Sequence, residues 1–219
     1  MKHEFSIEKP RGLKDLFPGQ FTTFSWLDSA VTAPSLITVI TTRKANGRPN
    51  ACLHAWGMLV GGHGSYSSVL SVAKRGHTYA NIVREKEWCV CIPQWRFRQQ
   101  CFATIQCNQQ DNDEITDAGL TVESAAVIKA PRIAECPICL ECRLSWDHEL
   151  AAGDGNHIFV GKVVHAAIDE SVMVPDVAAK LDRMELMCSV PCALNPLTAE
   201  LSSNMGFARF TLWEEGPQA

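Results

Sequence analysis

The hydrophobic positions of this chain fall in short runs rich in β-branched residues, separated by turn residues. Residues 35–42 are Ser-Leu-Ile-Thr-Val-Ile-Thr-Thr, between Pro34 and the turn sequence Ala45-Asn46-Gly47. A run of this kind followed by Asn-Gly is typical of a strand that enters a hairpin. The same reasoning predicts three further strands in this half of the chain, at residues 50–60, 68–73 and 88–92.

The second half of the chain contains two longer apolar segments. Residues 138–146 and 158–167 are separated by a turn that contains Gly153-Asp154-Gly155-Asn156, which predicts a pair of strands. Helical spacing of apolar residues is rarer. It predicts a short helix that begins at Thr78, a helix over residues 176–187, and a loop with a short helix at residues 108–118.

Many short strands, few helices and no alternation of strand and helix favour an antiparallel barrel or sandwich. We therefore expect a mainly β protein with a few flanking helices. Residues 1–20 are polar and contain two prolines and two glycines, so we expect an N-terminal arm. Residues 21–219 are expected to form a single domain with a C-terminal helical extension.

Composition narrows the classes of function. The chain has 219 residues and a net charge of −4, which gives no general attraction to nucleic acid or to anionic membranes. No apolar run approaches the ~20 residues that a membrane span needs. The N-terminal residues lack the apolar core of a secretory signal, so the ten cysteines are expected to be thiols of a cytoplasmic protein.

The densest group of cations and small donors is Lys74-Arg75-Gly76-His77-Thr78. It follows an apolar strand and precedes a helix, so backbone N–H groups and the positive end of a helix dipole meet there. Lys74 and Arg75 could neutralise a phosphate, and Thr78 could donate its hydroxyl. The alternative is an ordinary helix start capped by Thr78 or His77 with two solvated cations beside it.

A second candidate stretch is Gly47-Arg48-Pro49-Asn50-Ala51-Cys52-Leu53-His54-Ala55-Trp56-Gly57. A flat aromatic ligand needs backbone N–H and C=O groups at a sheet edge and a side-chain amide that is both donor and acceptor. Asn50 and the backbone of residues 53–55 could supply these groups. Alternatively, Asn50 belongs to the turn and Trp56 to the core.

Taken together, these stretches resemble the flavin reductase-like, FMN-binding split-barrel family, and within it the flavoredoxin-type proteins. The resemblance rests on GRPNACLHAWG, SVLSVAKRGHTYANIVREKEWCVCIP, AGLTVE with APRIAECPICLECRL, and HIFVGKVV, in the family's order and spacing. It covers roughly residues 30–170. It implies an antiparallel Greek-key barrel, and a homodimer with the flavin near the subunit interface.

The resemblance also implies the positions of cofactor-binding residues. Asn50 and the backbone of Leu53, His54 and Ala55 would face the isoalloxazine ring. The ribityl chain and phosphate would be surrounded by Ser71, Lys74, Arg75, Thr78 and Asn81, and His157 would lie near the open face of the flavin or the partner subunit. The chain departs from the family at Ala73, where many relatives carry Arg, and at Leu53, where a small hydroxyl residue is common.

The function implied is electron transfer from NAD(P)H or a protein donor through bound FMN to an acceptor. The flavin carries the redox chemistry, so no catalytic side chain is required. No Gly-x-Gly-x-x-Gly fingerprint is present, so a nicotinamide would have to stack transiently on the flavin. Within this class, the chain is either a reductase that releases its flavin or a carrier that keeps it.

Two alternatives of a different class remain. Cys136, Cys139 and Cys142 have the spacing of metal and redox sites, which would suit a metal- or redox-sensing protein. Alternation along a strand would, however, point Cys139 and Cys142 to opposite faces, and buried thiols that bind no metal are favoured. Cys89 and Cys91 are predicted to share one face. The last alternative is a barrel that has lost its flavin.

Overall fold

The computed structural model describes residues 2, 4–106, 108–195, 197–201 and 206–211. The chain forms two compact units, one of residues 1–35 and 188–208 and one of residues 36–187 and 209–219. A small three-stranded sheet has the strand order β1-β11-β14. Its strands are β1 (Ser35–Leu36), β11 (Met187–Val190) and β14 (Gly206–Arg209).

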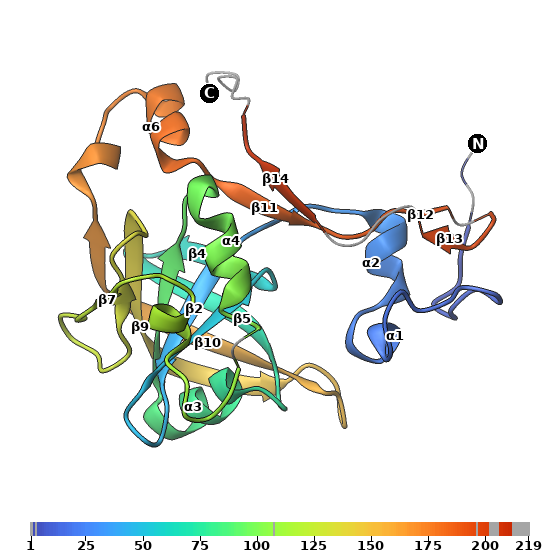
Figure 1. Cartoon of the computed structure of the whole chain (residues 1–219), viewed down its shortest axis with the longest axis horizontal. Helices are drawn as coiled ribbons and strands as arrows, with labels where there is room; N and C mark the ends of the chain where they lie inside the picture. Colours follow the sequence, from blue (N-terminus) through green and yellow to red (C-terminus); the bar gives the residue numbers. More distant parts are fainter. Residues whose placement is uncertain (1, 3, 107, 196, 202–205, 212–219) are drawn as a thin grey trace. The chain divides into compact units, whose positions relative to one another are not determined.

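A seven-stranded sheet makes up most of the larger unit (Figure 1). Its order is β3-β2-β6-β9-β10-β5-β4, and each neighbouring pair is antiparallel. The strands are β2 (Thr38–Arg43), β3 (Pro49–His54), β4 (Gly57–Gly62), β5 (Ser65–Ala73), β6 (Glu87–Ile92), β9 (Ile138–Glu149) and β10 (Asn156–Ile168). The mainly β, antiparallel architecture predicted from the sequence is confirmed.

The two edge strands of this sheet, β3 and β4, are consecutive in the chain. In a flat sheet their positions would be about 29 Å apart, at ~4.8 Å per strand. Only Ala55 and Trp56 connect them, and the Cα atoms of His54 and Gly57 are at most ~11 Å apart along three peptide units. The sheet therefore curls until its edges meet, and residues 53–57 form the corner of the resulting barrel.

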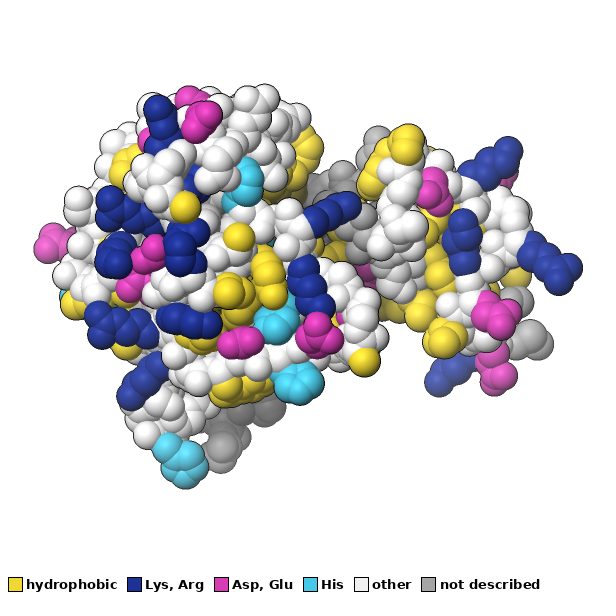
Figure 2. Space-filling view, turned by 90° about the horizontal axis from the view of Figure 1, so that it is seen from below, with side chains coloured by type: hydrophobic (Ala, Val, Ile, Leu, Met, Phe, Trp, Pro, Cys, Tyr) yellow, Lys and Arg dark blue, Asp and Glu magenta, His cyan; other side chains and the backbone are white. Residues whose placement is uncertain are grey.

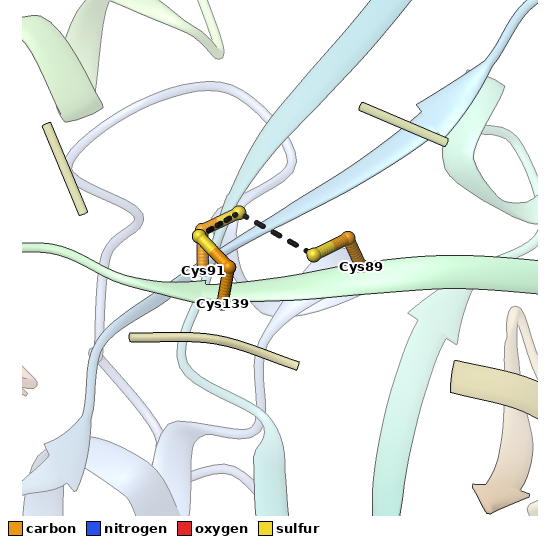
Figure 3. Close-up of side chains that lie close together, drawn as sticks. All are labelled: Cys89, Cys91 and Cys139. Atoms are coloured by element: carbon orange, nitrogen blue, oxygen red, sulfur yellow. Dashed lines mark hydrogen bonds between the residues drawn. The ribbon is translucent and has the colours of Figure 1, made fainter. Parts of the chain in front are cut away.

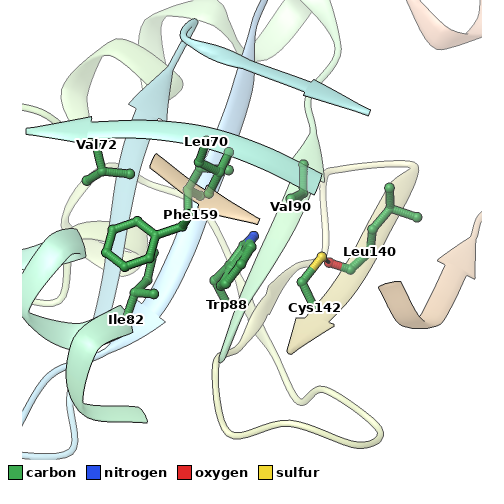
Figure 4. Packing of buried hydrophobic residues seen from close by; sticks show 9 residues of the cluster. Leu70, Val72, Ile82, Trp88, Val90, Leu140, Cys142 and Phe159 are labelled. Carbon is green, nitrogen blue, oxygen red and sulfur yellow. Dashed lines mark hydrogen bonds between the residues drawn. The ribbon is translucent and has the colours of Figure 1, made fainter. Parts of the chain in front are cut away.

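The barrel interior is filled by side chains from five strands and one helix (Figure 4). Alternation along β6 and β9 directs Trp88, Val90, Leu140 and Cys142 inward. Phe159 and Ile82 are fully buried beside them. Each fully buried large apolar side chain stabilises the fold by about 1.5–3 kcal/mol, so this cluster is the main core of the unit.

Short helices surround the barrel. They are α3 (His77–Glu85), α4 (Arg98–Ala103), α5 (Glu114–Asp117) and α6 (Val177–Met184), with single 3₁₀ turns at Trp95–Phe97 and Glu170–Val172. Residues between α5 and β9 add a small two-stranded sheet of β7 (Val122–Glu123) and β8 (Arg132–Ile133). The predicted short helix within residues 108–118 is confirmed by α5.

The smaller unit has its own apolar cluster of Leu13, Trp26 and Leu194. Its elements are α1 (Gln20–Thr23), α2 (Trp26–Val31), β12 (Leu194–Asn195) and β13 (Glu200–Leu201). Leu13 and Gln20 are buried, so the segment expected to be an arm contributes to this unit. That residues 21–219 form a single domain stays a prediction.

Three boundaries differ from the prediction. The strand expected at residues 50–60 is two strands, because the chain leaves its partner β2 after His54 and pairs with β5 from Gly57 onward. The helix expected to reach residue 187 ends at Met184, because Glu185 has a φ of 45° and β11 begins at Met187. The strand expected at residues 35–42 is also two strands, β1 and β2, which belong to different sheets. The C-terminal helical extension stays a prediction.

Within the described residues, none of the helices combines the length and apolar character needed to cross a membrane.

Candidate functional site

The N-terminus of α3 is the first component of the candidate site. Gly76 is its N-cap residue, with extended backbone and no side-chain cap. The first N–H groups of a helix have no partner within it, and the helix dipole adds about half a positive charge there. The alternative of a helix start capped by Thr78 or His77 is therefore wrong, and a helix N-terminus of this kind can bind an anion.

Hydrogen bonds between buried polar side chains link α3 to strands β2 and β3. The Asn50 amide donates to the Thr78 hydroxyl at 3.2 Å, and the Asn81 amide donates to the Thr42 hydroxyl at 3.0 Å. Asn50, Thr78 and Asn81 are each less than 5% exposed, and Thr42 pairs with Asn50 across the strands. Three predicted site residues are thus brought together.

The barrel corner supplies the second component. The backbone N–H of Leu53 binds Thr104 Oγ1 at 3.2 Å, and the N–H of Ser71 binds the carbonyl of Trp56 at 2.8 Å. These bonds fix the backbone of residues 53–56 between α4 and β5. Leu53, His54, Ala55 and Ser71 are all partly exposed there, as a contact with a planar ligand requires.

His54 is held as a neutral imidazole at this corner. Burial lowers its pKa from the usual 6.5 to about 4, which a bond to the Trp56 carbonyl only partly offsets. Because a carbonyl oxygen only accepts, Nε2 carries the proton in the 3.1 Å contact. The neighbouring thiol of Cys52 stays protonated at neutral pH, since burial raises its pKa to about 11.

The third component joins the end of β5 to the start of β10. The Lys74 N–H binds the Gly155 carbonyl at 2.8 Å, and Lys74 Nζ pairs with Glu149. His157 Nε2 is 2.7 Å from Asp147 Oδ1, and its ring lies 5.5 Å from that of Tyr79 on α3. Arg75 is exposed. The sequence identified Lys74 and His157 but not their carboxylate partners.

A buried ion pair lies behind the α3 N-terminus. Lys44 Nζ and Glu114 Oε1 are 2.7 Å apart, and both side chains are completely buried. His77 Nδ1 is 3.9 Å from the same carboxylate oxygen. Sequence reasoning missed this pair, because Lys44 in a hairpin and Glu114 in a polar loop look like surface residues.

Two imidazole nitrogens indicate that the site fits an additional group. His77 Nδ1 and His157 Nδ1 are buried and have no hydrogen-bond partner among the described residues. A buried polar atom without a partner is costly unless a ligand or water supplies one. Both lie on the segments that bound the α3 N-terminus. Figure 2 shows the molecule from below, with Lys and Arg side chains interspersed with Asp, Glu and His on that face.

Two surface hollows occur elsewhere. One of about 500 Å³ is lined by residues that include Arg43, Pro49 and Lys129, and one of about 370 Å³ lies in the smaller unit beside Lys9 and Trp26. Neither is lined by any of the ten predicted site residues. The candidate site therefore lies apart from both of these hollows.

The cysteine predictions are partly confirmed. Cys142 packs in the barrel core while Cys139 faces the other side of β9, so these two residues do lie on opposite faces. Cys89 and Cys91 share one face of β6. A site formed by Cys136, Cys139 and Cys142 together is therefore wrong, because the pleat separates the last residue from the other two.

Comparison with known proteins agrees with this architecture. The model of the flavin reductase like domain matches residues 31–178. No curated protein sequence matches the chain.

Three solved structures share the fold at low sequence identity. Nitrilotriacetate monooxygenase component B from Bacillus cereus has a TM-score of 0.74 and 18% identity, covering 94% of this chain and all of that one. Flavoredoxin of Desulfovibrio vulgaris has a TM-score of 0.70 and 18% identity, covering 95% and 96%. A putative flavin reductase with a split barrel domain from Shewanella frigidimarina has a TM-score of 0.71 and 14% identity, covering 94% and 100%.

Proposed function

Because the chain belongs to the flavin reductase-like family, whose members in the comparison are split barrels, we propose that it is an FMN-binding oxidoreductase. It binds FMN at the α3 N-terminus and the barrel corner and passes electrons from NAD(P)H or a protein donor to an acceptor. Bound FMN supplies the redox chemistry by taking up and releasing electrons.

The observation that carries this proposal is the α3 N-terminus with its Asn50–Thr78 hydrogen bond. A terminal phosphate is a compact dianion, which suits a single helix N-terminus flanked by Lys74 and Arg75. The Thr78 hydroxyl accepts from Asn50 and is also hydrogen-bonded to the Cys52 thiol, and it would donate its proton to a phosphate oxygen when FMN binds.

The barrel corner would orient the ring. The Leu53 N–H already binds Thr104, so the other N–H and C=O groups of residues 53–55 would contact the ring, and neutral His54 adds no charge beneath them. With Nε2 bonded to Trp56, its Nδ1 remains an acceptor. His157 would lie beside the ring, held by Asp147. The uncovered ring face is where we propose that a second copy of the chain packs, to give a homodimer.

The test is a binding titration of the purified chain with FMN, FAD and riboflavin, followed by flavin absorbance and fluorescence. We expect FMN to bind at least tenfold more tightly than riboflavin, which lacks the phosphate. Equal affinity for the two would show that the phosphate is bound elsewhere. Absence of FMN binding would overturn the proposal.

Rapid mixing of the FMN complex with NADH and with NADPH without oxygen then distinguishes the two flavin functions. Fast bleaching followed by release of reduced flavin indicates a reductase. If neither nicotinamide bleaches the retained flavin, the chain is a carrier reduced by another protein.

A further inference from the structure

A cluster of cysteine sulfurs lies on the outer face of β6 and β9 (Figure 3). Cys91 Sγ is 3.8 Å from Cys89 Sγ and 3.6 Å from Cys139 Sγ. These three sulfurs lie within 4.8 Å of one another, and no other such group of metal-ligating side chains occurs within the described residues.

A fourth sulfur, that of Cys136, contacts Cys91 but lies outside the group of three that are all within 4.8 Å of one another. Hydrogen bonding of the Cys136 thiol to Cys91, together with burial, raises the pKa of Cys136 well above its usual value. Cys91 thus receives contacts from Cys89, Cys136 and Cys139 at once. This set differs from the one suggested by the sequence, which lacked Cys89 and Cys91 and included Cys142.

The strand register explains why these residues converge. Cys91 pairs directly with Cys139 across β6 and β9, and Cys89 lies two residues before Cys91, on the same face. Cys136 precedes Cys139 by three residues, and its N–H bonds to the Ile133 carbonyl at 3.0 Å. Two chelating pairs, Cys-x-Cys and Cys-x-x-Cys, are therefore brought together from segments more than forty residues apart.

Water is excluded from this cluster. Cys89, Cys91, Cys136 and Cys139 are all at most 8% exposed. The segment before β9 covers them: Thr41 on the neighbouring strand donates to the Pro131 carbonyl, and Ala130 and Ile133 are buried. A closed, dry site is typical of structural rather than catalytic metal centres.

We propose that Cys89, Cys91, Cys136 and Cys139 bind one thiophilic metal ion, Zn²⁺, in a closed tetrahedral site. With Zn–S bonds of 2.3 Å, sulfurs at the corners of a tetrahedron lie about 3.8 Å apart, which agrees with the Cys91–Cys89 and Cys91–Cys139 separations. Four soft sulfur ligands favour zinc over hard cations such as Mg²⁺ or Ca²⁺. The ion ties the segment that precedes β9 to the face of the barrel.

Metal binding would release the thiol protons. Zinc coordinates the thiolate, and each proton passes to the solvent as its Zn–S bond forms. Zinc affinity should therefore fall as the pH is lowered.

The experiment is metal analysis of the full chain, purified without chelators and then loaded with Zn²⁺ under reducing conditions. We expect one zinc ion per chain, and loss of that zinc in Cys91→Ala. The matched control is Cys142→Ala, because Cys142 is equally buried on the opposite face of β9. Substoichiometric zinc in the unchanged chain, or equal zinc in both variants, would overturn the proposal.

A second measurement decides the question if Cys91→Ala fails to fold. Co²⁺ added to the unchanged chain should give the intense visible bands of a tetrahedral thiolate complex, displaced by Zn²⁺. A weak spectrum typical of six-coordinate cobalt contradicts the site. Neither readout depends on flavin, so the zinc proposal and the proposed function can fail separately.

Discussion

The indole ring of Trp88 lies against the backbone of Gly161. A Cβ atom on Gly161 would be 2.5 Å from Trp88 Cζ2 and 2.9 Å from the Arg143 carbonyl oxygen. Trp88 Nε1 also donates to Ser68 Oγ at 3.3 Å, and Ser68 pairs with Gly161 across β5 and β10. One ring from β6 thus contacts two strands on the other side of the barrel.

We expect Gly161→Ala to destabilise the chain by about 1–3 kcal/mol or more, the usual cost of an overpacked core. A methyl group overlapping a buried indole and a strand carbonyl must displace one of them. The measurement is the free energy of unfolding in denaturant. Gly62→Ala is the control, since no atom lies within 4 Å of its added Cβ, and a comparable loss there would contradict the packing argument.

Removing together the two side chains proposed to bind the phosphate tests the candidate site. Thr78→Ala with Lys74→Ala should weaken FMN binding by more than ~1.5 kcal/mol, because charge-assisted hydrogen bonds are worth about that much each. Flavin fluorescence titration measures the change. Lys86→Ala, in the C-cap of α3, should leave the affinity unchanged. Riboflavin affinity should be the same in all three proteins.

Breaking the buried pair behind the site should be costly. We expect Lys44→Met to destabilise the chain by about 3–5 kcal/mol, because Glu114 keeps a buried charge without its partner. Lys44 also donates to the carbonyls of Gln109 and Asn112, so this loop loses its anchor. Thermal unfolding of Lys44→Met and of Lys44→Met with Glu114→Leu should show partial recovery in the double variant. No recovery would mean that the loop contacts dominate.

Lowering the pH should destabilise the fold, because Glu141 becomes protonated. Burial of Glu141 opposes ionisation, but bonds from the backbone of Ala126 and Val127 and from Arg132 outweigh it and lower its pKa. A carboxyl whose pKa is lower in the folded state contributes stability above its unfolded pKa, ~4.3 for Glu, and loses it as the pH falls through the folded value. Denaturant unfolding between pH 7 and pH 3 checks this.

The Glu141→Gln variant serves as the comparison in that series. It should be less stable at pH 7 and should show a shallower dependence on pH below about 4.3. Parallel curves for the two proteins would show that other carboxylates cause the acid effect.

The sequence by itself determined the elements whose signals are local. Alternation with a period of two located the strands and correctly separated Cys139 from Cys142, since a one-residue step changes the face of a strand. Asn46-Gly47 fixed the first hairpin, and the group from Lys74 to Thr78 indicated the helix start where the cofactor is proposed to bind.

Only the tertiary structure decided which distant residues meet. The division of residues 50–60 into two strands follows from barrel closure, which depends on the register of all seven strands. For the same reason Lys44 reaches Glu114, and the Cys89–Cys91 pair reaches Cys136 and Cys139. A local pattern specifies the direction of a side chain, whereas its partner is set by strand order and register, which no single segment of the sequence contains.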